Sequence, residues 1–315
     1  MRIVFAGTTE FAARALGALL DAGHQVPLVL TRPDRPAGRG MRQNTTIVKR
    51  LALDRGIGVY QPTTLKEPGA VAPLAAVGAE LLVVAAYGLI LPQAMLDSAT
   101  RGALNVHASL LPRWRGAAPI QRALLAGDRE TGITIIKMDA GLDTGPMIAQ
   151  GILPIGDADD AGTLEDKLTA LGAKMIVEVV AKYATGDVHL TPQPEQGACY
   201  AAKIERHEPV LEWTLPARQL DRVVRAFRPV PGAAALLGDE SLKIWRAQPV
   251  DASGFPGEVL AASADGIVIA CGEGALQVTE LQRAGGRRLG AGDFLRGRAL
   301  LPGTRFSAPA KGPRA

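Results

Sequence analysis

The feature that most constrains the fold is the alternation of short β-branched runs with helical stretches in the first half of the chain. Apolar residues recur at helical spacing in residues 9–23, whereas five apolar runs predict strands, at residues 2–7, 25–34, 79–88, 102–109 and 131–139. Strands that alternate with helices favour right-handed βαβ units and an α/β fold with a doubly wound, mostly parallel sheet. Ligands of such sheets bind beyond the carboxyl ends of the strands, where we expect Tyr87, His107 and Asp139.

The character of the chain changes in its second half. A helical pattern over residues 162–186 is followed at 187–203 by a segment rich in Pro, Gln and Gly, which is typical of an exposed linker. Beyond it, residues 207–227 predict a helix, and several short apolar runs separated by Gly and Pro predict a small barrel or sandwich. We therefore predict a first domain, a linker and a second domain, with boundaries at 1–189, 190–206 and 207–315.

Composition excludes several classes of protein. A hydrophobic content of 47% is typical of a globular chain, and an aromatic content of 4% is too low for a surface that stacks bases. Cys199 and Cys271 stand far apart and the four histidines show no ligand spacing, so neither a disulfide framework nor a metal site is predicted. The sequence FAGTTEFAA has one glycine where a dinucleotide-binding turn needs three, which argues against an NAD enzyme. Without a signal-peptide pattern or an apolar run of about 20 residues, we expect a cytoplasmic protein with no membrane partner.

Asn105, His107 and Ser109 alternate along a predicted strand, so their side chains share one face as far as the strand continues. His107 fits two interpretations, a hydrogen-bonded histidine at a strand end or the centre of a reaction. The neighbouring amide, with its two donors, and the neighbouring hydroxyl add weight to the second interpretation. The three residues alone leave both interpretations open.

A second polar group follows the fifth predicted strand, in the sequence MDAGLDTGP, where Asp139 and Asp143 bracket Gly141. Asp and Gly are common in turns, which would explain them without any function. The functional interpretation is a loop whose backbone approaches a ligand, with one carboxylate directed at His107. A carboxylate partner orients a histidine and raises its basicity, as general acid–base catalysis requires.

Two basic regions are candidates for contact with phosphate groups. The sequence PDRPAGRGMRQ and the residue before it carry four arginines with Asp34 as the only acid, namely Arg32, Arg35, Arg39 and Arg42. The stretch after position 282 contains one acid, Asp293. Its basic residues are Arg283, Arg287, Arg288, Arg296, Arg298, Arg305, Lys311 and Arg314. A solvated loop and a solubilising tail are the alternatives. The net charge of +4 admits a nucleic-acid partner without requiring one.

Taken together, the sequences NVHASLLP, GLDTG, AYGLILP and PDRPAGRG closely resemble the formyltransferases that use 10-formyltetrahydrofolate. The resemblance covers nearly the whole chain, and PRWRGAAPIQRAL with the second domain is similar to the members that act on tRNA. It implies a Rossmann-like catalytic domain followed by an OB-like β-barrel. It also implies transfer of the formyl group to the α-amine of methionine on initiator methionyl-tRNA, for translation initiation. Nothing in the sequence demands a dimer or a metal, so we expect a monomer without a metal.

The resemblance further implies roles for individual residues. Asn105, His107 and Asp143 match the catalytic residues: the amide and a protonated histidine donate to the oxyanion formed when the amine attacks, and the carboxylate orients the histidine and accepts the amine's proton. The residues that match folate-contacting positions are Ser109, Leu110, Leu111, Pro112, Tyr87, Gly88, Leu89, Ile90, Leu91 and Asp139. The residues that match the insertion facing the acceptor end of tRNA are Arg35, Arg39 and Arg42.

The sequence departs from the family at residues 41–49, where MRQNTTIVK lacks the prolines of the family's basic run. The departure concerns the stiffness of the loop that faces tRNA and not the catalytic motif. Two other functions share parts of the pattern. A formyl-folate hydrolase, or a transferase acting on a small amine such as an amino sugar, would use the same three residues without a basic second domain. An inactive RNA-binding protein would have no need to assemble the three residues.

Overall fold

The computed structural model describes residues 1–37 and 42–308, with side chains described except at 35–37, 42–44 and 68. The chain divides into two compact units that are interleaved in sequence. Unit 1 contains the described residues of Met1–Pro119, Glu130–Pro154 and Glu165–Ala202. Unit 2 contains Ile120–Arg129, Ile155–Leu164 and the described residues from Lys203 onward. This interleaving was not predicted from the sequence.

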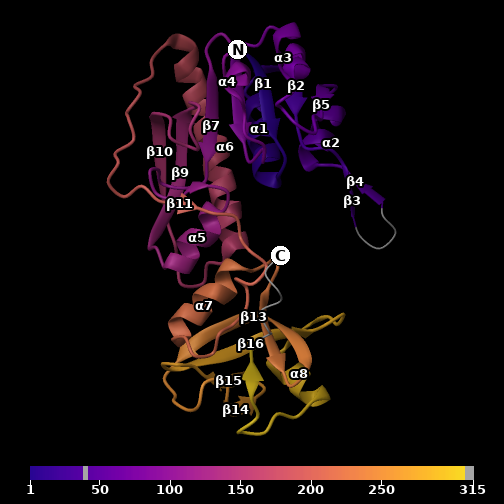
Figure 1. Ribbon diagram of the computed structural model, residues 1–315, viewed down its shortest axis with the longest axis vertical. Coiled ribbons are helices and arrows are strands. Elements are labelled where there is room, and N and C mark those ends of the chain that lie inside the picture. Colours follow the sequence, from indigo (N-terminus) through magenta and orange to yellow (C-terminus); the bar gives the residue numbers. More distant parts are fainter. Residues whose placement is uncertain (38–41, 309–315) are drawn as a thin grey trace. The chain divides into compact units, whose positions relative to one another are not determined.

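Unit 1 contains a seven-stranded sheet in the order β10-β9-β7-β6-β1-β2-β5 (Figure 1). The strands are β1 (Arg2–Gly7), β2 (Gln25–Leu30), β5 (Gly58–Tyr60), β6 (Leu81–Ala85), β7 (Ala103–His107), β9 (Glu130–Lys137) and β10 (Met147–Pro154). The five strands from β7 to β5 are parallel. Every residue of β6 and β7 is buried, as expected for apolar strands covered on both faces. The predicted α/β class with a mostly parallel sheet is confirmed.

The helices of unit 1 lie in the connections between the strands. They are α1 (Glu10–Asp21), α2 (Ile47–Asp54), η1 (Pro68–Val71), α3 (Ala72–Ala76), α4 (Gln93–Leu96) and most of α6 (Ala161–Thr185). Both long predicted helices, at 9–23 and 162–186, are confirmed as α1 and α6. A glycine with positive φ follows each helix within two residues, Gly23 at 81° and Gly186 at 79°, which is a common way to terminate a helix.

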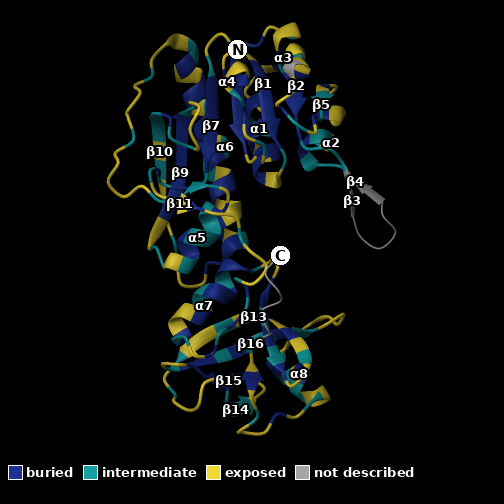
Figure 2. Cartoon of the chain, in the orientation of Figure 1, coloured by how far each residue is buried: buried dark blue, intermediate teal, exposed yellow. Residues whose placement is uncertain are grey.

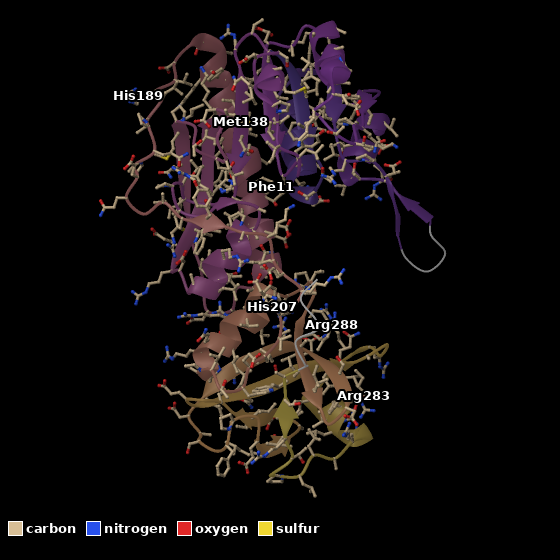
Figure 3. All side chains as sticks on the ribbon, viewed as in Figure 1. Phe11, Met138, His189, His207, Arg283 and Arg288 are labelled. Atoms are coloured by element: carbon tan, nitrogen blue, oxygen red, sulfur yellow. The ribbon has the colours of Figure 1, made fainter. Side chains whose placement is uncertain are left out.

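The two faces of β7 meet different surroundings. On one face, Val106 lies close to Gly172 of α6. A Cβ atom added at Gly172 would lie only 3.2 Å from Val106 and 3.3 Å from Phe11 of α1 (Figure 3 labels Phe11). On the other face Ala103 belongs to an apolar cluster. Since side chains alternate along a strand, Asn105 and His107 continue the face of Ala103 toward the carboxyl end of β7.

One predicted position was wrong, that of Asp139. Strand β9 runs antiparallel to β7, pairing His107 with Thr134 and Leu104 with Lys137. Strand β9 therefore begins beside the carboxyl end of β7 and ends beside its amino end. Consequently Asp139, which follows β9, lies beyond the amino end of β7, where the Met138 N–H donates to the Ala103 carbonyl at 2.8 Å.

The segment after α6 is largely exposed, as predicted, but hydrogen bonds attach it to unit 1 (Figure 2). Thr191 exchanges two backbone hydrogen bonds with Met147 at 2.8 and 2.9 Å. Further on, β11 (Tyr200–Ala201) pairs in parallel with β8 (Arg115–Gly116). The segment is therefore part of the architecture of unit 1.

The basic insertion forms a hairpin of β3 (Arg35–Ala37) and β4 (Arg42–Asn44), and its base is held by side chains. Asp34 accepts hydrogen bonds from Lys49 Nζ at 2.5 Å and from Gln61 Nε2 at 2.8 Å. These two hydrogen bonds, led by that of Lys49, hold the pKa of the Asp34 carboxyl below its usual value. Thr46 caps α2 by accepting the Lys49 N–H at 3.1 Å. The proline-free run thus supplies a helix cap and an ion pair.

Unit 2 contains a curled antiparallel sheet in the order β14-β15-β16-β13-β12-β18, with β17 beside β16. The strands are β12 (Ala233–Leu237), β13 (Glu240–Val250), β14 (Val259–Ser263), β15 (Gly266–Ala270), β16 (Ala275–Arg283), β17 (Arg288–Gly290) and β18 (Phe306–Ser307). The two ends of the sheet meet at a bridge between Glu258 and Arg305, supported by a hydrogen bond from the Phe306 N–H to the Gly257 carbonyl at 2.7 Å. This arrangement confirms the predicted barrel-like second fold.

Helices α7 (Ala217–Ala226) and α8 (Ala291–Gly297) also belong to unit 2. The predicted helix at 207–227 was wrong in extent, because Pro216 is the N-cap residue of α7 and turns precede it. The helix α5 (Pro119–Ala126) contributes to unit 2 as well. Its Leu125 packs on the apolar core, and Arg122 forms a two-point ion pair with Glu208.

Candidate active site

The three predicted catalytic residues lie in contact. Asn105 Nδ2 donates to Asp143 Oδ1 at 3.0 Å, and the other carboxylate oxygen, Oδ2, lies 3.6 Å from His107 Nδ1. The exposed fraction of each side chain is small, 6% for His107 and 11% for Asp143. Because solvent screens such a pair weakly, the carboxylate acts on the ring more strongly than it would at a surface. The structure therefore brings the motifs NVHASLLP and GLDTG together.

The ring of His107 has a defined orientation. Its Nε2 lies 2.8 Å from the Trp114 carbonyl oxygen, which can only accept, so Nε2 carries a proton. The atom left to gain or lose a proton is Nδ1, and it faces Asp143. The same carboxylate accepts the Gly116 N–H at 2.8 Å, from a backbone with φ of 113° that favours glycine. Residues 114–116 thus orient both the histidine and the aspartate.

Backbone strain gathers at this site. Among the described residues, the non-glycine residues with positive φ are Ala86 at 42°, Trp114 at 63° and Asp143 at 54°. Such conformations cost on the order of 1–3 kcal/mol each and persist where the surroundings enforce them, commonly at active sites. Trp114 supplies the carbonyl that holds His107, Asp143 supplies the carboxylate, and Ala86 precedes Tyr87. Their distribution is independent support for a functional site here.

Hydrogen bonds from β9 hold the turn that follows His107. Thr134 Oγ1 donates to the Ser109 carbonyl at 2.7 Å and accepts the Leu111 N–H at 3.0 Å. Gln150 of β10 also donates to the Leu111 carbonyl, at 2.8 Å. Thr134 and Gln150 were not identified from the sequence, because nothing in an isolated strand pattern marks a residue that supports a distant turn.

The four predicted folate-contacting residues of this turn differ in exposure. Ser109 is fully buried and donates to the Arg113 carbonyl at 2.6 Å, and Leu111 is buried as well. Leu110 and Pro112 are half-buried. We infer that Ser109 and Leu111 shape the turn, whereas Leu110 and Pro112 have side-chain surface available to a ligand.

The second predicted folate segment, residues 87–91, combines a buried tyrosine with exposed apolar surface. Tyr87 is buried, and its hydroxyl has no hydrogen-bond partner among the described residues. Burial raises the pKa of this hydroxyl to about 12, so it remains a donor at neutral pH. Ile90 is 86% exposed, Leu89 and Leu91 pack on the apolar cluster, and Gly88 accepts a hydrogen bond from Arg32 at its carbonyl. An unsatisfied donor beside exposed apolar surface fits a ligand with an apolar ring and polar edges.

Asp139 has a structural task that the sequence did not predict. Its Oδ1 accepts the Gly141 N–H at 3.0 Å and the Thr144 hydroxyl at 2.7 Å. A side chain at Gly145 would collide with the Lys137 carbonyl, so the loop also requires that glycine. These contacts shape the loop that presents Asp143. The contact of Asp139 with folate stays a prediction.

Gln193 is a site residue that the sequence analysis missed. Its Nε2 donates to the carbonyl oxygens of Asp143 and Gly145, each at 2.8 Å. Its Oε1 accepts from the Arg115 guanidinium at 2.8 and 3.0 Å. It lies between two prolines in the exposed segment, where no motif or periodic pattern marks it.

The predicted tRNA-contacting residues lie mostly beyond what the structure describes. Arg39 falls outside the described residues, and of Arg35 and Arg42 only the backbone is described, in β3 and β4. In unit 2, Arg283 pairs with Glu240 at 3.3 Å, and the Arg288 guanidinium lies 3.5 Å from the Trp245 ring centre (Figure 3 labels both arginines). Lys311 and Arg314 also fall outside the described residues.

Residues 1–37 and 42–308 contain no group of three or more His, Cys, Asp or Glu side chains placed to hold a metal ion. In the same residues no helix is long and apolar enough to cross a membrane. Both cysteines are free thiols.

Sequence comparison defines the class of protein. Residues 1–180 match the family described as formyl transferase, and residues 203–299 match the formyl transferase C-terminal domain. The chain therefore belongs to the formyl transferase family. Within it, the chain is similar to the methionyl-tRNA formyltransferase of Dechloromonas aromatica strain RCB, at 55% identity over 98% of this chain and 100% of that one. The methionyl-tRNA formyltransferase of Aromatoleum aromaticum strain EbN1 is 57% identical over 99% and 98% of the two chains.

Solved structures show the same fold. HypX from Aquifex aeolicus, in complex with tetrahydrofolic acid, superposes with a TM-score of 0.65 at 20% identity. The match covers 94% of this chain and 47% of HypX, so the chain spans about half of that protein. At this identity the likeness concerns the fold alone.

Proposed function

We propose that this formyltransferase transfers the formyl group of 10-formyltetrahydrofolate to the α-amine of methionine on initiator methionyl-tRNA. The observation that carries the chemistry is the arrangement of His107 and Asp143, with Nδ1 and Oδ2 3.6 Å apart and Nε2 fixed on a carbonyl. Support for the acceptor comes from the identity of 55–57% with methionyl-tRNA formyltransferases over nearly the full length.

The residues of the site divide the chemistry between them. The amine forms the new C–N bond as the bond between the formyl carbon and the folate nitrogen breaks, so one proton must leave the amine and one must reach the folate nitrogen. Asp143 is placed to accept the first. Asn105 has a second amide hydrogen, and a protonated His107 has its Nδ1–H, to donate to the formyl oxygen as negative charge develops on it. A donor placed in this way contributes on the order of 3 kcal/mol to catalysis.

The donor set fits 10-formyltetrahydrofolate as co-substrate. Tyr87 offers an unsatisfied buried hydroxyl, and Leu110, Pro112 and Ile90 offer apolar surface. When bound, the folate supplies the activated formyl group, and these residues orient it beside His107. We assign the residues 87–91 and 109–112 to folate binding, with Ser109 and Leu111 acting through the backbone they hold.

The acceptor side of the proposal rests on the basic residues. Arg35, Arg39 and Arg42 are assigned to the acceptor end of initiator methionyl-tRNA, because guanidinium groups suit phosphates. Residues 207–315 are assigned to support of the tRNA, residues 1–189 to catalysis and residues 190–206 to their connection. We propose that the enzyme works as a monomer in the cytoplasm and needs no metal.

The test is a direct assay of the purified chain with 10-formyltetrahydrofolate and charged initiator methionyl-tRNA, following formyl-methionine on the tRNA. Free methionine and charged elongator tRNA serve as control acceptors. We expect rapid formylation of the initiator tRNA alone. Formylation of free methionine at a comparable rate, or of no tRNA at all, would contradict the proposal.

The alternative functions are distinguished in the same assay. A formyl-folate hydrolase would release formate at the same rate without any acceptor. A transferase for a small amine would accept an amino sugar in place of the charged tRNA. We expect neither activity above background.

A further inference from the structure

An exposed segment contains one side chain whose amide hydrogen-bonds at both ends. Within residues 191–199, every residue except Gln193 and Cys199 is exposed, and these two are half-buried. The segment has no helix or strand of its own, so burial here needs a local cause. For Gln193 the cause is a set of four hydrogen bonds to unit 1.

The contacts of Gln193 use its amide group at both ends. Both hydrogen bonds from Nε2 reach carbonyl oxygens of the catalytic loop, those of Asp143 and Gly145, at 2.8 Å. These carbonyls lie on either side of Thr144, so they fix the peptide planes that follow the strained Asp143 backbone. The Oε1 end accepts two N–H groups of Arg115 at 2.8 and 3.0 Å.

Arg115 stands between the two residues that orient the catalytic pair. Trp114 supplies the carbonyl for His107 Nε2, and Gly116 supplies the N–H for Asp143 Oδ2. Gln193 therefore connects the segment that aims the histidine with the loop that carries the carboxylate.

We propose that Gln193 is a positioning residue for formyl transfer, which sets the separation of His107 Nδ1 and Asp143 Oδ2. The inference rests on the proposed function for its kinetic consequence, but the geometric part concerns the free enzyme. None of its four hydrogen bonds reaches the side chains of Asn105, His107 or Asp143. Its effect passes through the carbonyls of Asp143 and Gly145 and through the guanidinium of Arg115.

Three variants separate positioning from a general structural role. Gln193→Glu keeps the size and the acceptor for Arg115 but cannot donate to the two carbonyls. Gln193→Ala removes all four hydrogen bonds. Gln196→Ala changes an exposed glutamine of the same segment and is the matched control.

We expect kcat to fall about 10-fold to 100-fold in both Gln193 variants, since displacements near 1 Å have effects of that size, with both KM values within about twofold. The pH profile of kcat should shift, because the histidine and carboxylate no longer interact at the same distance. Gln196→Ala should match the wild type. The proposal is overturned if the Gln193 variants behave like Gln196→Ala, or if their loss equals the loss of folded protein with an unchanged pH profile.

A measurement without substrate tests the geometry separately. The ring nitrogens of His107 are observed by proton–nitrogen NMR at a fixed pH, with His107→Gln used to assign them. We expect Gln193→Ala, which adds no charge, to change the chemical shifts of Nδ1 and Nε2, and Gln196→Ala to leave them unchanged. Unchanged chemical shifts in Gln193→Ala would overturn the positioning role. If the chemical shifts change but the wild type does not formylate methionyl-tRNA, the proposed function fails and the positioning role stands.

Discussion

The polar site of unit 1 and the part of unit 2 after position 203 differ in their buried side chains. Within unit 1, the buried residues from β7 to β9 include five polar side chains, namely Asn105, His107, Ser109, Thr131 and Thr134. In the described residues of unit 2 after position 203, no charged residue and no Ser, Thr, Asn, Gln or His is buried; the buried Asp159 and Asp160 of unit 2 precede this part of the chain. The charged groups of that region lie at its surface instead, in ion pairs such as Arg246 with Glu280 or over aromatic rings.

We interpret this difference as a division of roles, with the chemical step in unit 1 and binding of the acceptor at the surface of unit 2. A buried polar group costs free energy unless it is hydrogen-bonded, so a fold retains such groups where their interactions are used. Unit 1 also carries all three strained non-glycine residues, Ala86, Trp114 and Asp143. Unit 2 has an apolar core and offers charge on its surface. We therefore expect substitutions in the polar site to change turnover, and substitutions on the charged surfaces to change binding of the acceptor.

The largest effect is expected at the catalytic pair. His107→Ala and Asp143→Ala should each lower kcat by about 10²–10⁴-fold, because each removes a group that handles a proton or a developing charge. Initial rates of formylation measure the loss, and circular dichroism checks that the fold is retained. Turnover near that of the wild type in either variant would break the assignment of chemistry to unit 1.

A smaller effect is expected in the hairpin. Arg39→Ala and Arg42→Ala should raise KM for methionyl-tRNA about 5-fold to 10-fold while leaving KM for 10-formyltetrahydrofolate unchanged, since each removes a proposed phosphate contact. Repeating the measurement at several salt concentrations should give a shallower dependence for each variant. Equal changes for both substrates would place these arginines outside the acceptor site.

In unit 2 we expect a change in binding of only a few-fold. Arg288 lies against the Trp245 ring, which holds the guanidinium in place, and we propose that it contacts a phosphate of the tRNA. Arg288→Gln should raise KM for methionyl-tRNA about twofold to threefold with kcat unchanged. Arg296→Gln is the control, because Arg296 is already paired with Asp293. A fall in kcat without a change in KM would show that unit 2 takes part in the chemical step.

The smallest effect is expected on stability at high pH. It involves one buried weak acid from each unit, the Tyr87 hydroxyl and the Cys271 thiol. Burial raises the pKa of the Tyr87 hydroxyl from 10.0 to about 12 and that of the Cys271 thiol from 9.0 to about 11. A raised pKa means that the unfolded chain loses the proton first. The stability contributed by the protonated group is therefore complete below the unfolded pKa and is lost as pH rises through the folded one.

Urea unfolding between pH 8 and about 11 measures this effect. Cys271→Ala should remove part of the decline that begins near pH 9.0, and Tyr87→Phe part of the decline that begins near pH 10.0. Parallel curves for the wild type and both variants would show that neither group is protected from solvent.

Sequence patterns predicted the strands well because they are local, whereas the pairing of the two polar motifs came from the family resemblance and the catalytic role of their residues stays a prediction. The β-branched runs at 2–7 and 79–88 became β1 and β6, and the motifs NVHASLLP and GLDTG placed three residues that the structure brings into contact. The direction of β9 was not predictable, because periodicity reports which face is buried and not which neighbour a strand pairs with. Gln193 was missed for a related reason, since its partners are Arg115 and the Asp143 loop, far away in sequence.

The interleaving of the units limits how this chain can be divided. A single cut after residue 202 leaves α5 and residues 155–164 on the first fragment, although they belong to unit 2. Leu125 would lose the apolar core on which it packs, and Arg122 would lose Glu208. A stand-alone catalytic half is thus not obtained by truncation, and an engineered fragment would need new surface residues on α5. An exchange of unit 2 between relatives would likewise have to transfer all three of its segments, 120–129, 155–164 and the residues from 203 onward.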